Sequence, residues 1–137
     1  MTLAGPYEIV IVGGGPAGLA AATESAAMGL RVALVDEQAA PGGQIYRAIT
    51  STPVQRRGIL GPDYWHGQAL AAGFARSGAT YAPRTTVWAV TREAAGLEIA
   101  LSSEGQARLV HAKQVILATG AQERPFPIPG WTLPGVM

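Results

Sequence analysis

The chain of 137 residues contains no cysteine, few charged side chains and no long apolar run. Without cysteine, these residues can form no disulfide, no thiolate zinc site and no redox-active dithiol. Charged residues make up 14% of the chain and the formal net charge is +1, which argues against a nucleic-acid partner. No segment reaches the roughly eighteen uninterrupted apolar residues of a membrane span.

The N-terminus lacks the features of an export signal. No basic start precedes the first apolar run, and that run leads directly into a glycine-rich turn, so we expect a cytoplasmic protein. What the chain has in quantity is apolar residues, at 48% of the composition, which is typical of a globular protein with much buried sheet. A length of 137 residues predicts a single domain.

The rest of the chain is organised around a glycine turn between an apolar strand and a helix. Four apolar residues, Ile9–Val12, predict a buried parallel strand, and glycines come directly after them. Gly13 allows the tight reversal, Gly15 lets the backbone approach a pyrophosphate, and Gly18 lets the helix pack on the strand. Spaced glycines alone also occur for steric reasons, so this interpretation depends on the elements that succeed them in the chain.

The residues after the turn complete a βαβ unit. Pro16 suits a first helical turn, the alanine-rich stretch 17–28 predicts the helix, and Gly29 is its natural stop. A second apolar strand over 31–35 ends on Asp36, eighteen positions after the last glycine of the turn. An acid at about that offset holds the ribose of a bound dinucleotide. Strand, glycines, helix, strand and acid in this register predict a dinucleotide-binding unit.

Further elements follow along the chain. The segment 37–47 predicts a loop whose paired glycines fit either a simple turn or a close approach of the backbone to a ligand. A polar loop over 48–61 leads to a helix over 62–77, which we interpret as the second crossover helix. A short third parallel strand over 79–82 ends at a proline.

The second half of the chain predicts an antiparallel sheet. Three runs of β character, 85–91, 97–102 and 107–111, are separated by short turns that contain glycine, and a buried strand over 114–118 comes next. The predicted fold class is therefore α/β, with a Rossmann-like parallel sheet, crossover helices and a three-stranded antiparallel β-meander. We expect this domain over 1–121 and an extended, proline-rich connector towards a second domain over 122–137.

Together these motifs resemble the two-dinucleotide-binding flavoprotein oxidoreductases, which include glutathione and thioredoxin reductases. The resemblance covers the glycine turn, Asp36, the meander and Val115–Gly120, which is similar to the ATG motif of their FAD domain. Within that group, residues 36–38 with 41–47, and residues 120–125 with 129–137, are similar to the FAD-containing subunits of opine oxidase, hydrogen cyanide synthase and hydroxyproline or proline dehydrogenase complexes. The resemblance implies that the chain is the N-terminal part of an FAD/NAD(P)-binding domain in a longer protein.

The same resemblance implies FAD as the cofactor. The residues themselves show no catalytic arrangement and no metal-ligand spacing, so we assign no catalytic side chain and no metal ligand. The implied cofactor-binding residues are Gly13, Gly15, Pro16, Ala17, Gly18, Asp36, Glu37, Gly43, Gln44, Val87, Ala118, Thr119 and Gly120. Asp36 is assigned to the ribose of the AMP half, with Glu37 as the alternative acid, and main-chain groups of Val87 are assigned to adenine. The acid also disfavours a 2′-phosphate through charge repulsion.

Three functions fit the sequence. The first is the FAD-binding portion of an oxidoreductase that oxidises the C–N bond of an amino acid or secondary amine and works with partner subunits or as a homo-oligomer. The second is an NAD(P)H-dependent flavin reductase of the thioredoxin reductase type, with any cysteine pair beyond Met137. The third is a nucleotide-binding or assembly module without turnover, because a sheet that lacks its final strand exposes an edge.

A few side chains outside the glycine motifs have alternative interpretations. His66 and His111 are the only histidines, and neither has a second histidine or a carboxylate at the sequence spacing of a metal site. We therefore expect structural roles for both, with buried or interfacial rings. Tyr64, Trp65 and Phe74 are expected in the core rather than against a flavin.

Overall fold

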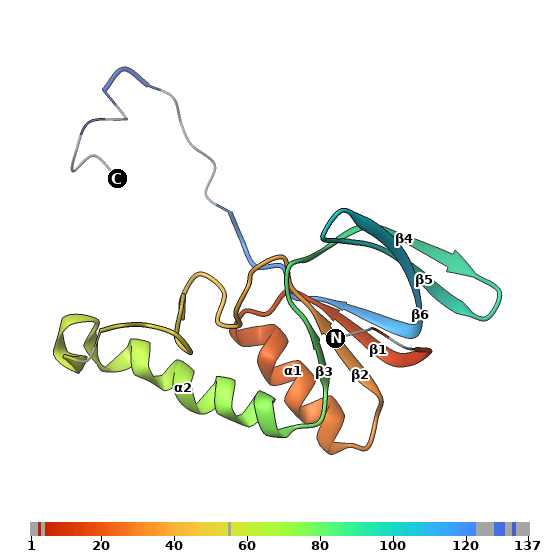
Figure 1. The fold of residues 1–137 in the computed structure, drawn as a ribbon, viewed down its shortest axis with the longest axis horizontal. Coiled ribbons are helices and arrows are strands. Elements are labelled where there is room, and N and C mark those ends of the chain that lie inside the picture. Colours follow the sequence, from red (N-terminus) through yellow and green to blue (C-terminus); the bar gives the residue numbers. More distant parts are fainter. Residues whose placement is uncertain (1–2, 4, 55, 123–127, 131–132, 134–137) are drawn as a thin grey trace.

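The computed structural model describes residues 3, 5–54, 56–122, 128–130 and 133. Much of the predicted connector, namely 123–127, 131–132 and 134–137, lies outside the described residues. Neither of the described α-helices is long and apolar enough to cross a membrane. In chain order the elements are β1 (Tyr7–Val12), α1 (Pro16–Ala27), β2 (Val32–Val35), the 3₁₀ turn η1 (Arg57–Ile59), α2 (Gly61–Arg76), β3 (Thr80–Ala82), β4 (Thr85–Glu93), β5 (Gly96–Ser103) and β6 (Gln106–Leu117) (Figure 1).

The strands form one six-stranded sheet in the order β3-β2-β1-β6-β5-β4. The pairs β1–β2, β2–β3 and β1–β6 are parallel, whereas β4–β5 and β5–β6 are antiparallel. Helix α1 connects the parallel strands β1 and β2, and α2 precedes β3, so both helices lie in crossover connections (Figure 1). The predicted fold class is confirmed: a Rossmann-like parallel part carries an antiparallel meander.

The last strand differs from the prediction. Two separate strands were expected at 107–111 and 114–118, but the structure has a single strand of 12 residues, β6. Its first half pairs with β5 up to Ala112, and from Ala112 onward it pairs with β1. Lys113 and Gln114 interrupt the apolar pattern without ending the strand, because both side chains are exposed. This continuous strand joins the meander to the parallel sheet.

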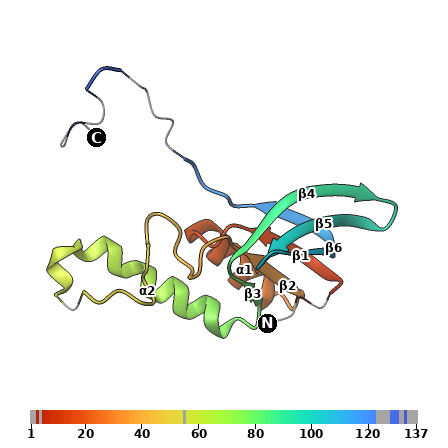
Figure 2. The same cartoon turned by 45° about the horizontal axis from the view of Figure 1, so that its top comes forward.

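The parallel strands lie between the two helices on one face and the meander on the other (Figures 1 and 2). Val10 and Ile11, neighbours in β1, are both fully buried but belong to different core clusters. Ile11 packs with residues of α1 and α2, and Val10 packs with residues of the meander. Burial on both faces explains why β1 and β2 are almost continuously apolar in sequence.

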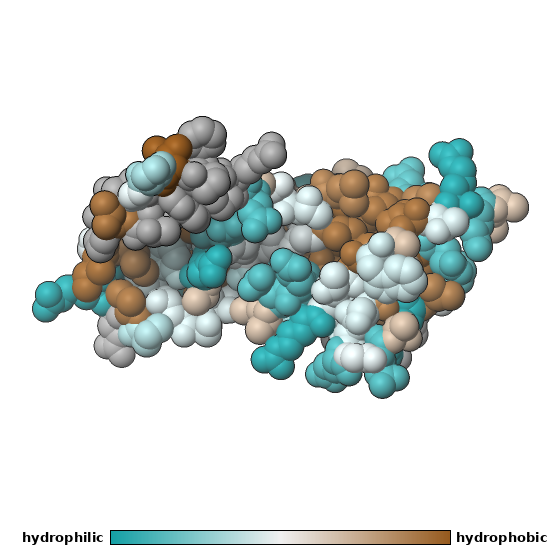
Figure 3. Space-filling view, turned by 90° about the horizontal axis from the view of Figure 1, so that it is seen from above, coloured by the Kyte–Doolittle hydropathy of each residue, from teal (hydrophilic) through white to brown (hydrophobic). Residues whose placement is uncertain are grey.

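The meander is covered less completely than the parallel strands. Apolar residues gather over it in the space-filling view (Figure 3). Among its large apolar side chains, Trp88 and Val90 of β4 and Leu109 of β6 are 62%, 43% and 58% exposed. Antiparallel strands tolerate one solvent-facing side, whereas parallel strands are usually covered on both.

The expectation that three aromatic residues of α2 lie in the core is correct for Phe74 and wrong for Tyr64 and Trp65. Phe74 is buried against the parallel sheet. Tyr64 and Trp65 are only half-buried. The Tyr64 hydroxyl donates to the Arg47 carbonyl at 2.7 Å, and the Trp65 Nε1–H donates to the Arg57 carbonyl at 2.8 Å. These two side chains hold the 47–57 loop against α2, because each has a polar group that needs a partner.

The expectation of buried histidine rings is wrong, since both histidines are exposed. An interfacial position stays a prediction. His66 lies on the outer side of α2, with its Nδ1 4.0 Å from Oδ1 of Asp63, one turn earlier. His111 lies on β6, where the neighbouring strands bring Glu93 and Glu98 to it. The sequence spacing concealed this second group, because its members are neighbours only across the sheet.

Candidate functional site

The candidate site forms where three parallel strands end together. Val12 of β1 is in register with Val35 of β2 and with Leu117 of β6, so the turns that follow these strands meet at one edge. The Gly13 N–H donates to the Val35 carbonyl at 2.8 Å, and the Ala118 N–H donates to the Val12 carbonyl at 2.8 Å. The structure thereby brings the glycine turn, the segment at Asp36 and the segment at Ala118 together.

The Asp36 carboxylate lies directly at the glycine turn. It is 7% exposed, its Oδ2 accepts the Gly14 N–H at 3.1 Å and its Oδ1 accepts the Gln38 N–H at 3.0 Å. Burial raises the pKa of Asp36 above its ordinary value, and the two backbone N–H donors oppose that shift. A carboxylate has about four lone-pair positions, so this one can accept further hydrogen bonds from a ligand.

Three glycines of the turn are required by close packing. A Cβ on Gly13, whose φ is +107°, would overlap the Ala118 carbonyl, and a Cβ on Gly18 would overlap the Gly13 carbonyl. A Cβ on Gly14 would overlap the Asp36 carboxylate. The sequence motif did not single out Gly14, because its requirement for glycine comes from a side chain 22 residues away.

Gly15 has a different environment. It precedes α1 as the N-cap residue with φ −74°, and a Cβ there would meet only the Gly43 Cα, at an ordinary 3.8 Å. The first turn of α1 has no acidic residue and the N-cap makes no side-chain hydrogen bond. Free N–H groups and the positive end of the helix dipole therefore face this space. The arrangement suits an anionic group such as a pyrophosphate.

The paired glycines of the 37–47 loop pack against the same turn. The Gly42 N–H donates to the Gly14 carbonyl at 2.8 Å. Gly43 has φ +61°, and a Cβ there would lie 2.8 Å from the Gly15 Cα. The loop is thus a turn whose backbone closely approaches the glycine turn and forms one wall of the space at Gly15.

Six further sequence-predicted residues lie in the segments that follow β1, β2 and β6. Pro16 and Ala17 form the first turn of α1, and Thr119 and Gly120 follow β6 as exposed residues. The remaining two loop residues of the prediction, Glu37 and Gln44, are also exposed.

Val87 lies on an edge strand near Asp36. The Thr85 N–H donates to the Asp36 carbonyl at 2.9 Å, which places the start of β4 beside the acid. Val87 follows two residues later, pairs with Leu101 and is next to a register shift in the ladder between β4 and β5. Since β4 is the last strand of the sheet, one side of its backbone is available to a ligand.

A separate cavity of about 450 Å³ opens where β3 leads into β4 and beside the turn between β5 and β6. Its lining includes Arg84, Thr85, Ser103 and Gln106 but no residue of the glycine turn. The candidate site is therefore the open rim at the strand ends and not this cavity.

Comparison with known proteins agrees with this geometry. A family model described as pyridine nucleotide-disulphide oxidoreductase matches residues 7–136. An opine oxidase subunit from Agrobacterium tumefaciens (strain Ach5) is 53% identical over 136 residues, which cover 96% of this chain and 27% of that protein. Hydrogen cyanide synthase subunit HcnB of Pseudomonas protegens is 43% identical over 128 residues, which cover 93% of this chain and 27% of that protein.

A solved structure has the same fold. The crystal structure of T. acidophilum thioredoxin reductase superimposes with a TM-score of 0.70 and 26% sequence identity, over 90% of this chain and 38% of that chain. The chain spans about a quarter of the length of the two curated relatives, 27% in each case.

Proposed function

Because the chain belongs to the pyridine nucleotide-disulphide oxidoreductase family, we propose that it forms the FAD-binding portion of an oxidoreductase that oxidises the C–N bond of an amino acid or secondary amine. The observation that carries this proposal is the buried Asp36 carboxylate, hydrogen-bonded to the glycine turn next to Gly15, where an added Cβ would touch only the Gly43 Cα. The substrate class is supported by the names of the relatives, which belong to an opine oxidase and to a hydrogen cyanide synthase.

The residues at the rim have separate tasks in this proposal. The backbone at Gly15 and the first turn of α1 hold the pyrophosphate, because this helix start has no side-chain cap and, among the described residues, no side chain lies within 4 Å of a Cβ added at Gly15. The Asp36 carboxylate accepts hydrogen bonds from the ribose hydroxyls of the AMP half while it retains its two backbone donors. Main-chain groups at Val87 lie on the edge strand that reaches the adenine, and Thr119 and Gly120 approach from the other side.

The chemistry that FAD would supply at this site is that of a hydride acceptor for the carbon next to the substrate nitrogen. The described part of the chain supplies binding and orientation, and we assign it no catalytic side chain. The relatives are named as subunits, so we propose that partner subunits, or further copies of the protein, complete the enzyme.

Gly15→Ala is the variant that tests the proposed cofactor site. The new methyl group meets no atom closer than 3.8 Å, so the fold should be preserved, but the methyl group occupies the space proposed for the pyrophosphate. We expect the protein that contains this chain to bind FAD, and the variant to bind it at least about tenfold more weakly, a loss of about 1.4 kcal/mol. Flavin absorbance after dialysis and titration calorimetry measure this.

The matched control is Gly73→Ala, at a glycine of α2 with no atom within 4 Å of the added carbon. Its FAD affinity should equal that of the unmodified protein. Equal affinity in Gly15→Ala, or a folded protein that binds no FAD, would contradict the proposal. The second outcome would favour the third candidate, a nucleotide-binding or assembly module without turnover.

The alternative enzyme is an NAD(P)H-dependent flavin reductase of the thioredoxin reductase type, which is supported by the structural similarity to that protein. The two candidates differ in the reductant. Under anaerobic conditions, amino acids and secondary amines should bleach the flavin absorbance if the first proposal is correct. Bleaching by NADH or NADPH and not by any amine would support the alternative.

A further inference from the structure

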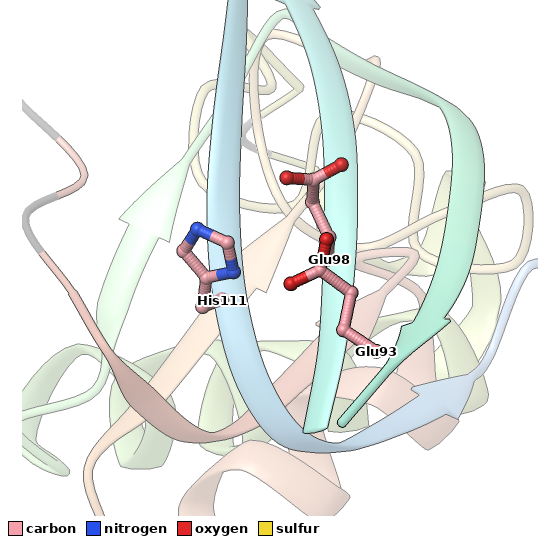
Figure 4. A group of neighbouring side chains, drawn as sticks. All are labelled: Glu93, Glu98 and His111. Atoms are coloured by element: carbon pink, nitrogen blue, oxygen red, sulfur yellow. The ribbon is translucent and has the colours of Figure 1, made fainter. Parts of the chain in front are cut away.

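Three side chains from three strands converge on the meander. Glu93 ends β4, Glu98 lies in β5 and His111 lies in β6. One ligand atom of each lies within 4.8 Å of the other two, and Figure 4 shows the two carboxylates beside the imidazole. We refer to these three residues as the Glu–Glu–His cluster.

The strand register explains why the three side chains meet. Glu98 lies directly opposite His111 in the antiparallel pair of β5 and β6, so both side chains point to the same face. In β4 the residue opposite Glu98 is Thr91, and Glu93 follows two positions later on the same face. Diagonal neighbours of this kind are within reach of long side chains. The residue opposite Glu93 is Gly96. Because Gly96 has no side chain, nothing from that position separates the side chains of Glu93 and Glu98.

Neither acid of the cluster forms an ion pair with a described lysine or arginine. Among the described residues, the ion pairs are Lys113 with Glu8 and His66 with Asp63. Lys113 shares the strand and face of His111, but its Nζ is directed to Glu8 at 3.3 Å. Like charges on adjacent strands repel each other, and a bound divalent cation would turn that repulsion into attraction.

We propose that the Glu–Glu–His cluster is a zinc-binding site. An imidazole nitrogen and carboxylate oxygens are ligands that Zn²⁺ accepts at about 2.0–2.2 Å. The imidazole makes a hard ion such as Mg²⁺ or Ca²⁺ a poor match, because those ions prefer an all-oxygen shell. Three protein ligands leave the remaining coordination to water.

The cluster lies apart from the candidate dinucleotide site. Leu97 of β5, the residue before Glu98, and Tyr7 at the start of β1 are both in register with Ala112 of β6. The cluster thus lies near the amino end of β1, whereas the candidate dinucleotide site lies at its carboxyl end, on the order of 15 Å away by strand geometry. A zinc ion here would tie β4, β5 and β6 together beside the turn that joins β4 to β5.

Zinc titration of the metal-free protein, prepared without a histidine tag, tests the proposal. We expect one Zn²⁺ per chain by calorimetry, and a rise in the thermal unfolding midpoint with increasing Zn²⁺. His111→Ala and Glu98→Gln should each weaken Zn²⁺ binding at least about tenfold, since a direct ligand is lost. Mg²⁺ at the same concentrations should produce no comparable change.

His66→Ala is the matched control, because His66 is also exposed and has one nearby carboxylate, Asp63, but belongs to no described three-ligand group. This variant should bind Zn²⁺ as the unmodified protein does. The proposal is overturned if the protein binds no Zn²⁺, if binding survives in His111→Ala, or if His66→Ala removes it. Circular dichroism of each variant separates loss of binding from loss of fold, and Glu98→Gln, which keeps the side-chain size, provides the second test should His111→Ala misfold.

Discussion

The carboxylates at the two ends of β1 are held in different ways. At the carboxyl end, Asp36 is buried and fixed by backbone N–H groups of Gly14 and Gln38. At the amino end, Glu93 and Glu98 extend from strands towards an exposed histidine, and no described backbone donor holds either of them.

At the glycine turn, the atoms that form the binding site also maintain the fold, whereas in the Glu–Glu–His cluster they do not. The glycine turn has its shape because main-chain atoms and the Asp36 carboxylate occupy the places where side chains would be. The strands of the meander keep their register whether or not Glu93, Glu98 and His111 are present, because main-chain hydrogen bonds and the inward-facing residues define it. Substitutions of Asp36 or of the closely packed glycines 13, 14 and 18 should therefore disturb the fold, whereas substitutions in the Glu–Glu–His cluster should mainly affect binding.

The largest expected effect is that of Gly18→Ala. The added carbon overlaps the Gly13 carbonyl, so either α1 or the turn must shift, and the free energy of unfolding should fall by about 3 kcal/mol. Gly73→Ala, in open space on α2, should instead raise it by about 0.5–1 kcal/mol through helix propensity. Urea denaturation of both variants measures the contrast, and a Gly18→Ala variant as stable as the unmodified protein would show that the turn is not closely packed.

A smaller effect is expected for Asp36→Ala. Loss of the carboxylate leaves the N–H groups of Gly14 and Gln38 without their acceptor, so the free energy of unfolding should fall by about 1–3 kcal/mol near neutral pH. Glu98→Ala, at the other end of β1, should change it by less than about 0.5 kcal/mol. Equal losses in the two variants, measured by urea denaturation, would remove the distinction between the sites.

Asp36→Ala should also change how the free energy of unfolding depends on pH. Burial raises the pKa of Asp36 in the folded protein above its ordinary value of 3.8, so the folded state binds this proton more tightly than the unfolded chain. The resulting stabilisation is complete below pH 3.8 and is lost as the pH rises through the raised pKa. As the pH rises from 3.8 through the raised pKa, the free energy of unfolding should decline more steeply in the unmodified protein than in Asp36→Ala. Superimposable pH profiles would contradict the raised pKa of Asp36.

The smallest effect is expected for Glu93→Gln in the absence of metal. Removing one of two neighbouring negative charges should raise the free energy of unfolding by about 0.2–0.5 kcal/mol at low ionic strength. Because the site is exposed, high salt should screen the repulsion and abolish the difference. Thermal unfolding of Glu93→Gln and of the unmodified protein, at low and at high salt, measures the stability difference under each condition. A loss of stability in Glu93→Gln would mean that this carboxylate has a favourable partner after all.

Local patterns in the sequence were sufficient for the parallel half of the fold. The apolar run before Gly13, the alanine-rich helix that ends before Gly29, and the acid directly after the second strand depend on near neighbours in the chain, and each lies in the expected element. The glycine spacing also predicted a close-packed turn at Gly13 and Gly18. Short apolar runs and helix stop signals are properties of a few consecutive residues, so they can be read without a structure.

Tertiary structure decided the features that depend on residues far apart in sequence. The requirement for glycine at position 14 comes from the Asp36 carboxylate, and the continuity of β6 comes from its change of partner at Ala112. The meeting of Glu93 and Glu98 with His111 follows from the strand register. The composition of each strand identified which residues alternate between faces, but only the hydrogen-bonded pairing of the strands determined which side chains became neighbours.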